Sequence, residues 1–89
     1  MPITLIERGT VRPRGEIIFE VKRTDSFNDD SDAAHSAPRI GTVQVARNGY
    51  WAVFAGRSVS RKNEVASGKA EDFDKAVKAA EQQAETILG

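Results

Sequence analysis

The first part of the chain contains two short runs in which apolar and polar residues alternate. Residues 3–7 alternate weakly, whereas residues 16–22 place Ile17, Phe19 and Val21 on one side of an extended backbone. A period of two in β-branched and aromatic residues is typical of strands with one buried face. Two glycines and a proline lie between the runs. We therefore expect an antiparallel hairpin with a loop at this point.

A second pair of strand-like runs covers residues 42–46 and 50–55. Asn48 and Gly49 lie between them, and an Asn-Gly pair favours a two-residue turn because both residues tolerate positive φ. Residues 57–66 then continue as a strand or an extended connection. These patterns predict a second hairpin that is followed by a further strand.

The predicted turn determines which residues of this hairpin share a face. Arg47 would lie opposite Tyr50 and Val43 opposite Phe54, and residues that lie opposite each other point to the same side of a sheet. One face, which we expect to be core, then carries Val43, Val45, Ala52 and Phe54 and ends in Arg47 and Tyr50. The other face is mixed and carries Thr42, Gln44, Ala46, Trp51, Val53 and Ala55.

Towards the C-terminal end, the apolar period changes to three and four residues. The apolar set is Phe73, Ala76, Val77, Ala80, Ala84, Ile87 and Leu88, with charged and amide residues between its members. This predicts an amphipathic helix over about residues 72–88, with Asp72 or Asp74 as its N-cap. Because most of the apolar stripe is alanine, we expect the helix to lie close against a sheet.

Residues 24–38 have a different composition from the rest of the chain. Phe27 is the only large apolar residue among them, and four aspartates are present. Burial of so few apolar side chains cannot offset the conformational entropy that the segment would lose on ordering. We therefore expect a mobile acidic loop. The overall prediction is a single α+β domain over residues 1–89. It has an antiparallel sheet of four to five strands and one C-terminal amphipathic helix packed on one face.

Composition excludes several kinds of chemistry. The chain of 89 residues has no cysteine, which excludes disulfides and thiolate metal sites. The single histidine, His35, lies in the predicted loop, where no packing would hold a general base. We expect no catalytic residue, metal or cofactor. No apolar run reaches the ~18 residues of a membrane span. The apolar run at residues 1–6 is too short for the apolar region of a signal peptide. We therefore expect a cytoplasmic protein without a membrane partner.

The charges are segregated although the chain is neutral overall. It has 13 basic and 13 acidic residues, but residues 33–63 contain five basic residues and no acidic one. Arginine pairs well with phosphates and carboxylates, and an exposed aromatic side chain can anchor a partner. We therefore predict a partner-binding surface made of Arg47, Tyr50, Trp51, Arg57, Arg61 and Lys62. The alternative is that both aromatic residues belong to the core and that the basic residues are ordinary solvated strand ends.

The second half of the chain, residues 41–88, resembles the AP2-like, arm-type DNA-binding domains of phage integrases. The shared features are the strand Gly41-Thr42-Val43, the turn and aromatic strand Asn48-Gly49-Tyr50-Trp51, and the alanine-rich segment from Phe73 to Ala80. In that family a three-stranded sheet enters the major groove. The resemblance therefore implies DNA contacts at Gln44, Arg47, Trp51 and Arg57.

In general character, the chain is similar to the accessory proteins of phages and mobile elements, such as anti-CRISPR inhibitors. The shared features are small size, absence of cysteine and absence of an enzyme motif. We expect a non-enzymatic binding module whose partner is a host protein or a nucleoprotein complex. Two alternatives stay open, which are sequence-specific DNA binding through the sheet and a homodimer formed through the uncovered sheet face.

Overall fold

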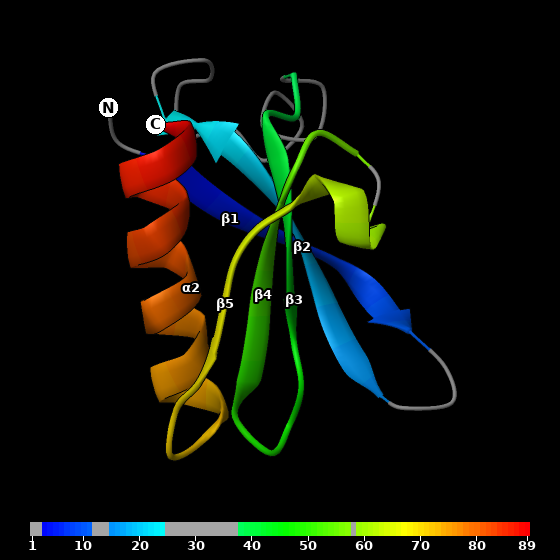
Figure 1. Cartoon of the computed structure of the whole chain (residues 1–89), viewed down its shortest axis with the longest axis vertical. Helices are drawn as coiled ribbons and strands as arrows, with labels where there is room; N and C mark the ends of the chain where they lie inside the picture. Colours follow the sequence, from blue (N-terminus) through cyan, green and yellow to red (C-terminus); the bar gives the residue numbers. More distant parts are fainter. Residues whose placement is uncertain (1–2, 12–14, 25–37, 58) are drawn as a thin grey trace.

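The computed structural model describes residues 3–11, 15–24, 38–57 and 59–89. Five strands form one antiparallel sheet in the order β1-β2-β3-β4-β5. They are β1 (Ile3–Val11), β2 (Glu16–Arg23), β3 (Gly41–Val45), β4 (Tyr50–Ala55) and β5 (Glu64–Lys69). A short 3₁₀ helix, η2 (Arg61–Asn63), precedes β5, and the α-helix α2 (Phe73–Leu88) packs on one face of the sheet (Figure 1).

This arrangement confirms the predicted α+β fold, with an antiparallel sheet and a C-terminal helix on one of its faces. The acidic stretch at about residues 24–38, which we predicted to be a mobile loop, lies almost wholly outside the described residues. The helix predicted at about residues 72–88 is found at Phe73–Leu88. The alternation of apolar and polar residues therefore predicted strands, and the three- and four-residue apolar period predicted the helix, as the structure has them.

Helix α2 begins and packs as its sequence pattern predicts. The carboxylate of Asp72 accepts a hydrogen bond from the backbone N–H of Lys75 at 2.9 Å and so caps the first turn. Ala76, Ala80 and Ala84 are spaced about one helical turn apart and are fully buried. They form one core cluster with the buried strand residues Ile3, Phe19, Val21, Val43, Val45 and Val53. Because the helix contributes small side chains here, it can lie close against the sheet.

The turn between β3 and β4 differs from the predicted two-residue form. The backbone N–H of Ala46 donates to the carbonyl of Tyr50 at 2.7 Å, so three residues connect the strands. The last of them, Gly49, has a φ of 102°, which suits the longer hairpin turn that ends in a positive-φ glycine. The carbonyl of Gly49 also accepts a hydrogen bond from the backbone N–H of Ala70 at 2.9 Å. A Cβ at Gly49 would overlap the carbonyl oxygen of Ala70.

The extra turn residue shifts the register, and the predicted assignment of faces in β4 was wrong. Val45 lies opposite Trp51 and Val43 opposite Val53. Since a shift of one residue moves every side chain of a strand to the other face, Trp51 and Val53 lie on the helix-covered face. Ala52 and Phe54, which we predicted to be core residues beneath the helix, lie on the opposite face with Thr42 and Gln44.

Trp51 packs against the residue opposite it on the neighbouring strand β5. It lies opposite Gly68, and a Cβ at Gly68 would stand only 2.7 Å from the indole Cζ2. The tryptophan is half-buried and contacts the core cluster. Gly68 therefore leaves the space that the indole occupies on the helix-covered face.

Substitution of Ala80 by Asp should unfold the chain or nearly so. The carboxylate would be buried between α2 and the sheet without a partner, and such changes cost about 4 kcal/mol or more. Thermal or urea unfolding followed by circular dichroism measures the loss. Gln82→Asp adds the same charge to an exposed position of α2 and should change stability by only about 0.5 kcal/mol. Equal stability of the two variants would contradict the assigned helix face.

Substitution of Gly68 by Val should displace the indole of Trp51. We expect a loss of about 1–3 kcal/mol, which is typical of overpacking, together with a shifted tryptophan emission. Ser67→Val introduces the same side chain one residue earlier, on the other face of β5, and serves as the control. If Gly68→Val left both stability and emission unchanged, the Trp51–Gly68 packing would be refuted.

Candidate partner-binding surface

The face of the sheet opposite α2 carries a groove, which we call the open-face groove. Its volume is about 700 Å³, and strands β3, β4 and β5 supply most of its lining. The side chains on this face that line it are Glu16, Gln44, Ala46, Tyr50, Ala52, Phe54, Arg61, Glu64, Ser67 and Lys69. Figure 1 shows α2 and η2 on opposite sides of the strands, so η2 contributes Arg61 from the side away from the helix.

Tyr50 is the aromatic residue that this surface exposes. It begins β4, and 55% of its surface is accessible. Lys69 lies directly opposite it on β5, with the ammonium Nζ 5.1 Å from the centre of the ring. A cation at this distance from an aromatic ring is held by the ring's quadrupole. The pair therefore presents an aromatic ring and a positive charge side by side on the open face.

The structure separates the six predicted binding residues. Tyr50 and Arg61 line the open-face groove, and Arg47 lines an adjoining hollow together with Glu16 and Tyr50. Lys62 is exposed on η2, and Arg57 is exposed just after the end of β4. Of the six residues, the groove lining therefore includes Tyr50, Trp51 and Arg61, whereas Arg47 and Arg57 lie beyond opposite ends of β4.

Trp51 is the exception among the predicted residues. We expected its side chain on the face away from the core, but it lies on the helix-covered face, packed against Gly68. The alternative reading of the sequence, in which the aromatic residues belong to the core, thus describes Trp51 and does not describe Tyr50. The reason is the three-residue turn, which exchanges the two faces of β4.

The basic residues of this region differ in whether an acidic residue neutralises them. In the described part of the chain, no ion pair or side-chain hydrogen bond involves Arg47, Arg57, Arg61 or Lys62. Arg39, the fifth basic residue of the acid-free stretch, is instead paired with Glu20. Within the described ranges, four positive charges of the predicted surface are therefore available to a partner.

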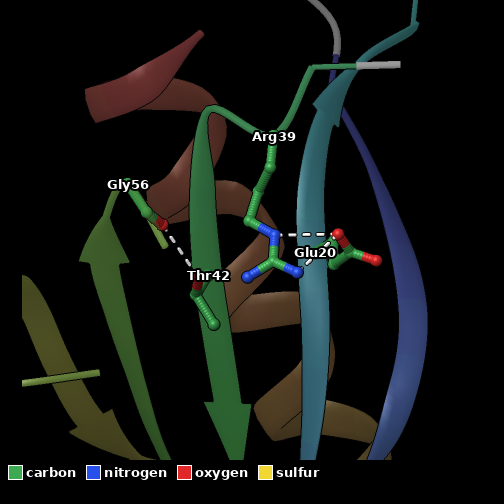
Figure 2. Close-up of polar contacts among 4 residues, drawn as sticks. All are labelled: Glu20, Arg39, Thr42 and Gly56. Atoms are coloured by element: carbon green, nitrogen blue, oxygen red, sulfur yellow. Dashed lines mark hydrogen bonds and ion pairs between the residues drawn. The ribbon is translucent and has the colours of Figure 1, made fainter. Parts of the chain in front are cut away.

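Arg39 forms an ion pair with Glu20 of the neighbouring strand β2 (Figure 2). The guanidinium donates through Nε at 2.8 Å and approaches through Nη2 at 2.6 Å, both to Oε1 of Glu20. The side chains of Arg39 and Glu20 are only 9% and 15% exposed. Nearby, the hydroxyl of Thr42 donates to the carbonyl of Gly56 at 2.8 Å. These contacts join β2, β3 and the end of β4.

Two opposing effects act on Glu20. Burial raises the pKa of its carboxyl group, but the hydrogen bond and the charge of Arg39, together with the charges of Lys22 and Arg8, outweigh burial. The pKa is therefore held below the ordinary value for glutamate. Glu20 is ionised at neutral pH and holds Arg39 against the sheet.

The groove residues that sequence reasoning missed are those brought together by strand pairing. Glu16 reaches the groove from β2, and Ser67 and Lys69 reach it from β5. Lys69 is the most informative of them, because it lies opposite Tyr50. Its separation from Tyr50 along the chain left no local pattern that could have identified the pair.

Other kinds of site find little support in the described residues. Among them, no three His, Cys, Asp or Glu residues are grouped so that they could hold a metal ion. No helix in the described ranges combines the length and apolar character that a membrane crossing requires. Comparison with protein-family models, with curated proteins and with solved structures found no match to this chain.

Glu20→Gln should lower stability at neutral pH by roughly 1–2 kcal/mol, because it removes a charge-assisted hydrogen bond. The folded state lowers this pKa, so the contribution of Glu20 is fully present above the pKa of free glutamate, ~4.3. It is lost as the pH falls through the lower pKa of the folded state. Urea unfolding of both proteins at a series of pH values should therefore show a gap that closes in acid.

The exposed pair of Glu71 and Lys75 provides the control for this experiment. Their nitrogen–oxygen distance is also 2.6 Å, but the side chains are 81% and 59% exposed. Glu71→Gln should therefore change stability by less than about 0.5 kcal/mol at any pH. A gap for Glu20→Gln that does not depend on pH would contradict the role given to the buried ion pair.

Proposed function

We propose that this chain is a small, non-enzymatic binding module that attaches to a macromolecular partner through the open-face groove and the basic residues beside it. The observation that carries this proposal is the exposed ring of Tyr50 on the sheet face opposite α2, next to Lys69 and Arg61. A central aromatic residue with charged neighbours is the composition of many binding hot spots. Such a module acts by occupying a surface of its partner.

We favour a host protein or nucleoprotein complex as the partner. The lining of the groove contains both signs of charge, because Glu16 and Glu64 lie in it with Arg61 and Lys69. A protein surface can place complementary groups against each of these. Inhibition of a host machine by an accessory protein of a phage or mobile element, as anti-CRISPR proteins do, would be such an interaction.

Sequence-specific DNA binding is the second candidate. Gln44 supports it, since this residue lies on the face opposite the helix, where arm-type domains are expected to read bases. Against it, Trp51 is turned to the other face, and the groove includes two carboxylates. If DNA is bound through phosphates, affinity should fall steeply with salt. Failure to bind any duplex at low salt would remove this candidate.

Tyr50→Ala should abolish capture of the partner while stability changes little. In a pull-down from host lysate, with and without nuclease, the protein enriched by the wild type should be absent with this variant. Loss of the cation–π contact should cost only about 0.5–1 kcal/mol, so unfolding should remain close to that of the wild type. Resistance of the captured partner to nuclease would identify it as a protein rather than a nucleic acid.

Val65→Ala provides the matched control for this test. Val65 is also exposed, at 41%, and it does not line the groove. We expect it to retain the partner at the wild-type level. If Tyr50→Ala retained the partner equally well, the proposed role of the open face would be rejected.

A further inference from the structure

The two edges of the sheet are poorly suited to pairing with another chain. In β1, the register shifts between Glu7 and Gly9, which leaves Arg8 as an extra residue. In β5, a corresponding shift leaves Val65 without a residue opposite it on β4. Bulges of this kind bend an edge strand and interrupt the hydrogen-bonding ladder that an added strand would need. A partner is therefore expected to lie on a face of the sheet.

Two cations line the side of the open-face groove nearest β5, where β5 also contributes Glu64. Arg61 from η2 and Lys69 from β5 both line it. Lys62, next to Arg61, is also exposed. No carboxylate in the described part of the chain pairs with these cations. The centre of the groove is instead formed by the smaller or apolar residues Ala52 and Phe54.

The exposed acidic residue of the lining, Glu64, distinguishes between classes of anionic partner. It reaches the groove from β5. A nucleic acid carries a phosphate at every nucleotide, so a strand long enough to cross the groove would bring phosphates close to this carboxylate. A polypeptide can place its own carboxylates only against the cations and can place apolar residues over the centre.

Building on the proposed function, we infer that the segment bound in the open-face groove is an acidic polypeptide, with a carboxylate against Arg61 and Lys69 and an apolar side chain beside Tyr50. The contact is made on the face of the sheet and adds no strand to its edge. Charge complementarity then determines which part of the partner is bound, while the exposed ring of Tyr50 supplies an aromatic contact.

A displayed library of random short peptides tests this inference before any natural partner is identified. Selection on the wild-type protein should enrich Asp and Glu several-fold over the starting library. Selection on the double variant Arg61→Glu/Lys69→Glu should lose these peptides and enrich Lys and Arg. Both replaced residues are exposed, and an unfolding curve of the variant verifies that it is folded.

Lys78→Glu is the matched control, since it reverses an exposed charge on helix α2, outside the groove lining. It should select the same acidic peptides as the wild type. A synthetic peptide from the selected pool should bind the double variant at least about tenfold more weakly than the wild type. The same peptide should bind the Lys78→Glu variant with an affinity close to that for the wild type.

Three results would overturn the inference. They are the absence of any enriched peptide on the wild type, enrichment of Lys and Arg on the wild type, and displacement of the selected peptide by a lower concentration of oligothymidine. The last result would assign the groove to nucleic acid. None of them bears on whether Tyr50→Ala abolishes capture of the partner, so this inference and the proposed function fail on different measurements.

Discussion

The close packing of an alanine-lined helix on a valine-rich sheet is the constraint on which the remaining structure depends. Ala76, Ala80 and Ala84 are fully buried, and the helix packs mainly on strands β3 and β4. Because α2 is the one α-helix in the described part of the chain, it covers only one face of the sheet in this way. The choice of face then decides which side chains of each strand are core and which are available for recognition, because side chains alternate along a strand.

The elements of this fold could be predicted from local patterns, but their alignment could not. The alternation in β2 and the three- and four-residue period of α2 each appear within one segment of sequence. The register of β3 and β4 depends on the turn at Asn48 and Gly49, and there the local preference for a two-residue turn is overridden. The contact between Gly49 and Ala70 accompanies the longer turn, and Ala70 lies far along the chain.

The same reasoning explains which parts of the candidate surface could be predicted. The acid-free stretch contains five basic residues, and among the described residues only Arg39 of these forms an ion pair. The aromatic signal was ambiguous, because two adjacent residues of a strand must point to opposite faces. Tyr50 and Trp51 therefore could not both be exposed on one surface, and the turn length decided between them. Lys69 and Gln44 join Tyr50 only through pairing between strands.

The three-residue turn has a consequence for how such a chain can change over time. Replacements at every second position of β3, β4 and β5 can alter the side chains that line the groove while the buried valines and alanines stay in place. Deletion or insertion of one residue between Ala46 and Tyr50 acts differently. It would turn the side chain of Tyr50 towards the helix-covered face and the indole of Trp51 towards the open face. The open face of this fold can therefore diversify by point substitution, whereas the length of this hairpin connection is expected to stay constant.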